Sequence, residues 1–541
     1  MTNKIRHFYR DTSIWSLALL GVGLFMAIPL LVVLLSLAKG TGETWAHLTR
    51  YFLLRYLGNS LVLVGGVGIL STILGVSAAW AVSRYAFPGR ELVVKLLYLP
   101  LAIPTYIMAY AYVGFLGNGG TLVRIEEMIG LSPSGIDFMN LGGLIWVLAL
   151  SLYPYVYASC RVAFSGLPAS LRSASALLGA SGLRYFFTVA LPLATPAIVG
   201  GVFLVTMEVL NDYGAAKYYG INTFTTGIFR TWTALEDLRS ATYLAALLIL
   251  FVLVAVYLSR LARGRRSFVT QSVSGSECSA RIVARGWRQW LVVGAVGTPL
   301  FFGLALPLGQ LLWWVSGEPA WGISFSLAWV GLQSLLVAIA AAVACLVLAL
   351  ALVFLSRWNQ LDVLRPISKL SVIGYAVPGA IIGIGTIGSS QLIVDFFADN
   401  YGWRIGYLFY GSSLVLLYAY AFRFLAVAYH PLEAHCLKLG KPLAEAAYLL
   451  GDGKLRALRN IELPLLVPAM VSALFLVFVD TLKELPLTLI LKPYDLNTLS
   501  IAAYTYAEDE QLAKAAPPAL LLILLVAIVL WSISFGKEAK R

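Results

Sequence analysis

The stretch that decides the fold runs from residue 445 to residue 464. It contains Glu445-Ala446-Ala447, then three residues, Gly451, nine further residues and Ile461-Glu462-Leu463-Pro464. Glu and Ala favour helix, glycine is common just after a helix C-terminus, and proline suits the first turn of a helix. Because long apolar runs flank this polar stretch, the pattern predicts a short helix, a turn and then a new membrane helix.

The same pattern occurs once more, 272 positions earlier in the chain. It contains Ser173-Ala174-Ser175, three residues, Gly179, nine further residues and Val189-Ala190-Leu191-Pro192. A second proline follows the Leu-Pro pair in both copies, as Pro196 and Pro468. A glycine, a Leu-Pro pair and a second proline at one offset indicate a tandem duplication. The alternative is a pair of amphipathic loop helices that bind no partner.

The composition excludes a soluble globular protein. The 541 residues are 60% hydrophobic and 12% charged, with a mean hydropathy of +0.84, whereas soluble domains are charged at about a quarter of their positions. We therefore predict an all-α polytopic membrane protein with two homologous six-helix halves. Twelve apolar runs are long enough to span a bilayer as helices, at roughly 13–38, 59–82, 92–116, 141–164, 191–213, 239–261, 289–315, 328–356, 367–393, 406–428, 463–487 and 515–536.

The distribution of basic residues predicts how the chain is oriented. Most of the 39 Lys and Arg residues fall at the termini, in the repeated stretches and in loops that share their side of the membrane. Since basic loops remain in the cytoplasm, we expect both termini to be cytoplasmic. The net charge of +13 is then a signal of topology. No soluble segment gathers enough basic and aromatic residues to bind nucleic acid, so the bilayer is the expected environment.

A polar linker is predicted to divide the chain into two membrane domains. Residues 263–288 begin with four residues that include three arginines and continue with Ser, Thr, Gln and Gly, a composition too polar for a span. The first domain is then 1–262, with its repeated stretch at 169–192. The second is 289–541, with its repeated stretch at 441–464.

Prolines interrupt the third predicted span and its counterpart in the second half. Pro100 and Pro104 lie in the run 92–116, and Pro378 lies in the run 367–393. A proline in a membrane helix frees a carbonyl and bends the helix. Such a bend suits a helix that lines a path, although a role in packing alone explains it as well.

Two acidic pairs occur near the ends of the fifth and eleventh predicted spans. Glu208 aligns with Asp480 and Asp212 with Glu484 at the offset of 272. Each pair is spaced i, i+4, so we expect both acids on one helical face. Carboxylates at the edge of a span usually face an aqueous cavity, which here predicts an electronegative path for a cation. The alternative is that Lys217 and Lys483 neutralise these acids, which then only stabilise the packing of the helices.

The repeated stretch resembles the EAA loop of ABC importer permeases, the cytoplasmic segment that docks onto an ATPase subunit. The second copy has the full pattern, whereas the first has Ser173 in place of the glutamate. The resemblance implies ATPase-coupling roles for equivalent residues of both copies, namely Ser173, Ala174, Gly179, Leu191, Pro192, Glu445, Ala446, Ala447, Gly451, Leu463 and Pro464.

The segments around the acids resemble fused ferric-iron permeases. They read Glu208-Val209-Leu210-Asn211-Asp212-Tyr213-Gly214 in the first half and Lys483-Glu484-Leu485-Pro486-Leu487-Thr488 in the second. The resemblance implies a type I ABC importer permease of the bacterial inner membrane with both domains in one polypeptide. It also implies two partners, a periplasmic iron-binding protein and a homodimeric ATPase.

The chain contains no GxxxxGK[ST] motif, so ATP hydrolysis must come from the partner. We expect no bound cofactor. We also expect no metal site at His430, Glu433 and His435, which lie just before the second repeated stretch. An enzyme is not expected, because no HExxH motif or Ser/His pair lies within a span. Two alternatives remain: an ion-coupled secondary transporter, or a permease of the same class that imports thiamine, a polyamine or a phosphonate.

Overall fold

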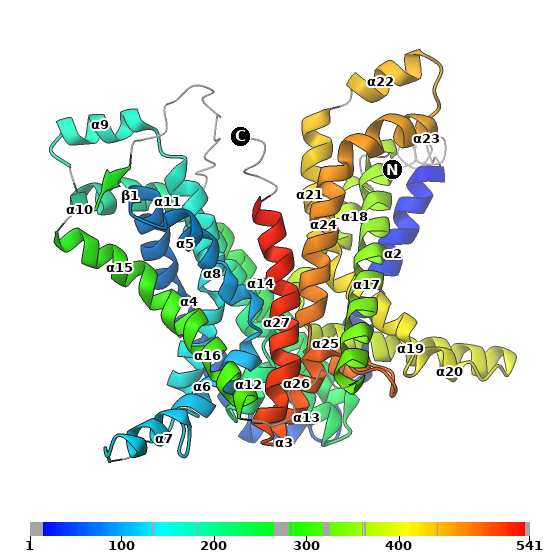
Figure 1. The fold of residues 1–541 in the computed structure, drawn as a ribbon. Helices are drawn as coiled ribbons and strands as arrows, with labels where there is room; N and C mark the ends of the chain where they lie inside the picture. The colour runs from blue at the N-terminus through cyan, green and yellow to red at the C-terminus, as the bar shows by residue number, and fades with distance from the viewer. Residues whose placement is uncertain are drawn as a thin grey trace.

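The chain forms two arms that approach each other at one end and diverge at the other, so that the molecule is V-shaped (Figure 1). The computed structural model describes residues 14–132, 135–180, 182–263, 281–284, 286–317, 325–359, 361, 364–440 and 442–535. The two chain ends, and most of the predicted linker at 263–288, lie outside these described residues.

The first half of the chain contains seventeen described elements. Up to the first repeated stretch they are α2 (Ile14–Ser36), the 3-10 helix η1 (Leu37–Lys39), α3 (Trp45–Tyr51), α4 (Leu53–Arg84), the strand β1 (Tyr85–Ala86), α5 (Arg90–Leu96), the 3-10 helix η2 (Leu99–Ala102), α6 (Thr105–Leu116), α7 (Thr121–Met128) and α8 (Leu141–Ser165). They continue as α9 (Ala169–Leu177), α10 (Gly182–Tyr185), the π-helix η3 (Phe186–Ala190), α11 (Leu191–Asn211), α12 (Gly214–Tyr218), α13 (Phe224–Thr233) and α14 (Leu238–Arg263).

The second half repeats the order of the main helices. It begins with the strand β2 (Ile282–Val283), which pairs in parallel with β1, and continues as α15 (Trp287–Leu300), the π-helix η4 (Phe301–Ala305), α16 (Leu306–Ser316), α17 (Phe325–Trp358), α18 (Arg365–Ser371), the 3-10 helix η6 (Ile373–Ala376), α19 (Gly379–Tyr401), α20 (Gly406–Phe409) and α21 (Ser413–Leu439). It ends with α22 (Pro442–Leu449), α23 (Lys454–Ala457), the π-helix η7 (Leu458–Glu462), α24 (Leu463–Lys483), α25 (Pro486–Leu491), α26 (Leu499–Glu508) and α27 (Leu512–Phe535).

The first helix of each half packs on the other half. Helix α2 lies against α17, α18 and α19, on the arm that carries α21 and α24 (Figure 1). Helix α15 in turn lies against α4. Where α2 crosses α19, Gly385 faces the backbone carbonyl of Pro29, and any side chain at 385 would collide with it. The two arms therefore differ from the two sequence halves, because the halves exchange their first helices.

Eleven helical segments in the described part of the chain are long and apolar enough to span a membrane. A bent pair, residues 90–102 and 105–128 with an angle of 94° between its parts, brings the number to twelve when the pair is counted as one span. The prediction of about twelve spans is confirmed, and so is the predicted interruption of the run 92–116 by proline. The chain breaks at Pro104 and, in the counterpart, at Pro378, because the residue before a proline is driven out of the helical region.

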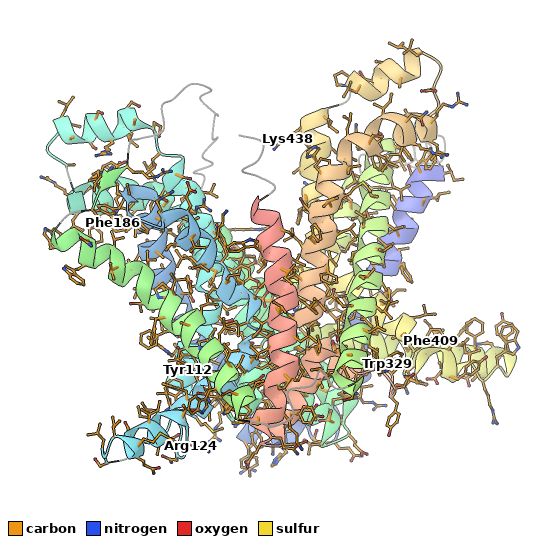
Figure 2. All side chains as sticks on the ribbon, viewed as in Figure 1. Tyr112, Arg124, Phe186, Trp329, Phe409 and Lys438 are labelled. Carbon is orange, nitrogen blue, oxygen red and sulfur yellow. The ribbon has the colours of Figure 1, made fainter. Side chains whose placement is uncertain are left out.

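The outer surfaces of both arms are apolar, as lipid contact requires. Side chains project outward along the full height of the arms (Figure 2), and large ones such as Trp329 on α17 and Phe301 on η4 are exposed. In water, exposed apolar area on this scale would be an aggregation hazard, whereas hydrocarbon solvates it. The two arms therefore span the bilayer side by side.

The two repeated stretches lie at the diverging ends of the arms, on the same side of the molecule (Figure 1). Each has a short helix, α9 or α22, that ends at a glycine with positive φ, +78° at Gly179 and +94° at Gly451. The amide after the glycine donates to a carbonyl five residues back in both copies, Ala180 to Ser175 at 2.9 Å and Asp452 to Ala447 at 3.0 Å. The predicted helix and glycine turn are confirmed in both halves.

The predicted start of the following membrane helix is wrong by about ten residues. Each span is continuous from Gly182 to Asn211 or from Lys454 to Lys483, so that Pro192 and Pro464 lie inside it. A π-helical turn, η3 or η7, directly precedes the Leu-Pro pair. Proline lacks an N–H and crowds the preceding turn, and the wider π turn accommodates it without ending the helix.

Asp237 fixes the start of α14 and ties it to the segment before α3. Its carboxylate accepts hydrogen bonds from the amide and hydroxyl of Ser240, at 2.9 and 2.7 Å, and of Thr44, at 3.0 and 2.7 Å. Burial alone would raise the pKa of Asp237, but these four hydrogen bonds outweigh it and lower the pKa to about 2. The side chain is an N-cap that also bridges two segments far apart in the sequence.

We expect Asp237→Ala to lower the free energy of unfolding by about 1–2 kcal/mol, the usual cost of a lost N-cap. Thermal unfolding in detergent measures this change. Because the pKa is lowered in the folded state, the contribution of the charge is present above pH 4 and is lost as the pH falls toward 2. Asp237→Asn keeps a capping oxygen but should remove this pH dependence, and an unchanged acid limb in that variant would contradict the assignment.

Candidate functional site

Both membrane helices that carry the acidic pairs end within the pair. Helix α11 ends at Asn211 and leaves Asp212 extended, with ψ of 125°, and α24 ends at Lys483 and leaves Glu484 extended, with ψ of 122°. The prediction that each pair lies on one helical face is therefore wrong, since only the first acid of each pair is helical. Gly214 and Pro486, two residues further on, are the helix-ending signals that could have indicated the break.

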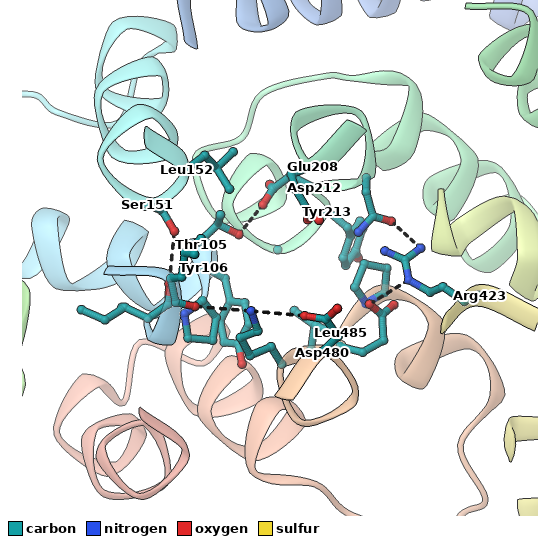
Figure 3. A pocket seen from close by; sticks show the side chains of 18 of the residues that line it. Thr105, Tyr106, Ser151, Leu152, Glu208, Asp212, Tyr213, Arg423, Asp480 and Leu485 are labelled. Carbon is teal, nitrogen blue, oxygen red and sulfur yellow. Dashed lines mark hydrogen bonds and ion pairs between the residues drawn. The ribbon is translucent and has the colours of Figure 1, made fainter. Parts of the chain in front are cut away.

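The breaks bring all four acids to one cavity of about 100 Å³ between the two halves (Figure 3). Glu208 and Asp212 come from the first half, and Asp480 and Glu484 come from the second. The remaining lining residues are contributed by the proline breaks, by α8, by α21 and by the segments after α11 and α24, and they include Pro104, Thr105, Ser151, Tyr155, Asn211, Tyr375, Arg423 and Lys483. The four acids of the two sequence pairs thus line one cavity.

The two acids of the first half are held by neutral groups. Glu208 accepts long hydrogen bonds from the hydroxyls of Tyr155 and Tyr375, both at 3.5 Å. Asp212 accepts from the hydroxyl of Thr105 and, at 3.0 Å, from the amide of Ala216 at the start of α12. These contacts orient the carboxylates but do not neutralise their charge.

The two acids of the second half are paired with cations. Asp480 lies 3.7 Å from the ammonium group of Lys483, which also donates to the carbonyl of Leu101 at 3.3 Å. Glu484 lies 3.4 Å from Nε of Arg423 and accepts from the amide of Leu487 at 2.9 Å. The alternative assignment of neutralising lysines is thus half right, because Lys483 lies at the site.

Lys217, the other lysine of that alternative, lies elsewhere. Its ammonium group is 3.8 Å from the Glu508 carboxylate, and both side chains are half-exposed. The cation that pairs with the buried acid Glu484 is instead Arg423, which is 5% exposed. Four carboxylates and two cations give the cavity a formal charge of −2. Such an excess of negative charge in a low-dielectric setting attracts cations and repels anions.

Arg423, Tyr155 and Tyr375 are site residues that the sequence reasoning missed. Tyr155 and Tyr375 have no acidic or aromatic counterpart at the 272 offset, so the repeat could not reveal them. Arg423 could have been found, because it is an ionisable residue inside the apolar run 406–428, and such residues are usually functional.

No three His, Cys, Asp or Glu side chains within the described ranges are grouped closely enough to hold a metal ion. The four cavity acids are spread around its wall and are bound to neighbouring donors. His430 and Glu433 approach to 3.9 Å at the end of α21, and the His430 side chain is exposed. In this conformation the described acids form a charged lining of the cavity and are not arranged as ligands around one point.

Tyrosines from both halves contact one another beside the cavity, and two of them, Tyr106 and Tyr213, line it. The rings of Tyr106 and Tyr504 are 6.0 Å apart, edge to face, and those of Tyr213 and Tyr504 are 6.1 Å apart. Tyr213 in turn stacks on Phe229 of α13 at 3.8 Å. This aromatic cluster links the cavity wall to α13 and α26.

The coupling residues implied by the EAA resemblance lie in and directly after the short helices α9 and α22. Ser173, Ala174, Glu445 and Ala446 are exposed, whereas Ala447 is buried against the rest of its arm. Two leucines at equivalent positions are 84–90% exposed at the end of each helix: Leu177, Leu178, Leu449 and Leu450. Leu191, Pro192, Leu463 and Pro464 open the first turn after the π-helical segments.

Comparison with known proteins explains this architecture. Residues 71–264, which include the first repeated stretch and the first acidic pair, match the family described as the binding-protein-dependent transport system inner membrane component. The second half repeats the same features. Residues 71–264 thus resemble this permease family. The proteins that the chain matches are described as transport components of the inner membrane or as permeases.

The permease is similar to full-length relatives over both halves. It is 25% identical over 518 residues to the Fe(3+)-transport system permease protein FbpB 2 of Haemophilus influenzae, covering 95% of this chain and 96% of the relative. It is 23% identical over 535 residues to the Ferric transport system permease protein FbpB of Actinobacillus pleuropneumoniae, covering 94% and 75%. A shorter match, 30% identical over 148 residues, is to the Molybdenum transport system permease protein ModB of Escherichia coli, covering 27% and 63%. The predicted fused two-domain permease is confirmed.

Proposed function

We propose that this permease carries ferric iron from the periplasm to the cytoplasm in an ATP-driven, binding-protein-dependent importer. The observation that carries the proposal is the single cavity between the halves, where four carboxylates outnumber two cations. A hard trivalent cation prefers oxygen ligands, and Glu208, Asp212, Asp480 and Glu484 offer them as a candidate translocation path. The names of the two full-length relatives support the same cargo.

The charge of the cavity also weighs against an oxyanion cargo. Partial matches include permeases named for molybdenum and sulfate transport. Sulfate is a dianion, and a cavity with a formal charge of −2 repels it. The same argument disfavours a phosphonate, whereas it leaves thiamine and polyamines, which are cations, as the competitors that an uptake experiment must distinguish.

The exposed leucine pairs support docking of a homodimeric ATPase at the two repeated stretches. Leu177 and Leu178 on one arm correspond to Leu449 and Leu450 on the other, and large apolar side chains at a helix end in water indicate a partner surface. Because the two surfaces are alike, two identical subunits can occupy them. This proposal places both repeated stretches and both termini in the cytoplasm, and the periplasmic binding protein at the opposite end, where the arms converge.

The continuous spans give the coupling a mechanical route. ATP binding would draw the docked subunits together and move α9 and α22 with them, and the rigid segments 182–211 and 454–483 would carry the motion to the cavity. In the second half the ion pair between Arg357 and Glu462, at 2.9 Å, fastens η7 to α17. Separation of Tyr106, Tyr213 and Tyr504 would then open the cavity toward the loaded binding protein.

Uptake of radiolabelled ferric iron into iron-starved cells tests the cargo. We expect deletion of this gene to abolish binding-protein-dependent iron uptake and leave uptake of labelled thiamine and putrescine unchanged. Loss of thiamine or putrescine uptake with intact iron uptake would overturn the ferric assignment. Copurification of an ATPase with the permease would distinguish the importer from an ion-coupled secondary transporter, which needs no such partner.

A further inference from the structure

A second, basic cavity lies at the ends of helices on the side of the repeated stretches. Its volume is about 600 Å³, and its wall is formed by the turn between β1 and α5, by the residue before β2 and by the last turns of α27. The lining residues are Ala86, Phe87, Gly89, Arg90, Glu91, Leu92, Lys95, Arg281 and Trp531. The spans α4 and α27 end beside it, at Arg84 and Ser532, so the cavity lies at the boundary between bilayer and water.

Among the described lining residues, three cations and one acid give a formal charge of +2. Arg90 is fixed by a hydrogen bond of 2.7 Å from Nε to the carbonyl of Val82, which leaves its terminal guanidinium nitrogens for other partners. The Lys95 ammonium group lies 5.8 Å from the centre of the Trp531 ring. Arg281 is exposed at the rim, and the β1–β2 pairing holds the segment that carries it beside α5. The cations thus come from two segments far apart in the sequence and converge on one space.

An apolar strip runs from this cavity toward the centre of the bilayer. Leu524 and Ile528 precede Trp531 at helical spacing on one face of α27 and are 56% and 57% exposed. Leu92 of α5, at the cavity wall, is also exposed. Tryptophan is enriched where membrane helices meet the head-group region. A basic pocket with an aromatic rim above an aliphatic strip matches the two parts of a phospholipid molecule.

We propose that this cavity binds the head group of an anionic phospholipid from the cytoplasmic leaflet, with its acyl chains along Leu524 and Ile528. Arg90, Lys95 and Arg281 would contact the phosphate and the negative charge of the head group, as basic pockets between membrane helices do. The site differs from the cargo cavity in position and in sign of charge, so the proposal does not depend on which cargo is carried.

Native mass spectrometry of the full chain, delipidated in detergent, tests the proposal. Dioleoyl phosphatidylglycerol is titrated into the wild type and into Lys95→Gln/Arg281→Gln, and we expect at least a 10-fold loss of affinity for the first bound lipid. Lys438→Gln/Arg184→Gln is the matched control, since it removes two exposed charges outside the cavity, and it should bind as the wild type does; Figure 2 shows Lys438 near the end of α21.

Two further titrations separate the possible ligands. Dioleoyl phosphatidylcholine should bind at least 10-fold more weakly than phosphatidylglycerol, and millimolar inorganic phosphate should fail to displace the bound lipid. Equal binding of the two lipids, displacement by phosphate, or wild-type affinity in the double variant would each overturn the proposal. If the double variant is not recovered folded, Arg281→Glu, at an exposed position, takes its place with the same expectation.

Discussion

Replacement of Glu208 by glutamine is expected to lower cargo uptake at least 10-fold while the permease stays folded in the membrane. Glutamine keeps the size of the side chain and can still accept hydrogen bonds from Tyr155 and Tyr375. It removes a negative charge that no cation in the described part of the cavity wall pairs directly. At about 4 Å and an effective dielectric constant of about 20, two unit charges interact by about 4 kcal/mol, so a multivalent cation loses substantial stabilisation.

The control for this variant is Asp399→Asn on α19, which neutralises an exposed acid outside the cavity. Initial rates of labelled iron uptake are measured at matched amounts of permease in the membrane. Equal rates in Glu208→Gln and in the control would contradict a role for Glu208 in the path. A parallel Asp480→Asn variant should have a smaller effect, because Lys483 already offsets that charge at 3.7 Å.

The second large effect is expected from Gly451→Val, which should uncouple ATP hydrolysis from transport. The φ of +94° at Gly451 is accessible to glycine, but a β-branched residue is strongly disfavoured there. The valine would force the turn after α22 to rebuild and would shift Leu449 and Leu450. We expect uptake to fall more than 10-fold, and ATPase activity of the purified complex to lose its response to the binding protein.

Gly453→Val is the matched control, only two residues away. Gly453 has a φ of −76° and a ψ of 162°, which any residue adopts, and a β-carbon there would meet no neighbour within 4 Å. Normal uptake in this control, together with the defect of Gly451→Val, would assign the effect to the turn. Normal uptake in both variants would refute coupling through this geometry.

The sequence alone was sufficient to predict the parts of the fold that recur in both halves. Hydropathy identifies the spans because hydrocarbon requires long apolar helices. The glycine turns at Gly179 and Gly451 follow from a backbone conformation that glycine favours. The convergence of Glu208, Asp212, Asp480 and Glu484 follows from the repeat, since two homologous halves that pack face to face bring equivalent residues together.

Features without a counterpart in the other half could not be found in the same way. Arg423 corresponds to Ser151, and Lys483 to Asn211, so the repeat itself points to neither cation of the cavity. The exchange of α2 and α15 between the arms depends on tertiary packing, and the hydropathy pattern of the sequence predicts helices but not which helices pack together. Proline at position 192 predicts the start of a helix, but the π turn before it lets the helix begin earlier and continue through the proline. This keeps the backbone hydrogen-bonded within the span, as hydrocarbon requires.

The acids of the second half are paired with cations and those of the first half are not, and this difference explains an advantage of joining both halves in one polypeptide. A symmetric dimer of the first half would place four acids and no cation around the cavity, a formal charge of −4, because Ser151 and Asn211 are neutral. A dimer of the second half would place four acids and four cations there and would be neutral. The intermediate value of −2 requires the halves to differ at Arg423 and Lys483. Because both halves are encoded in one gene, each assembled transporter contains one first half and one second half. The charge of the cavity therefore depends on a difference between the halves that a homodimer cannot have.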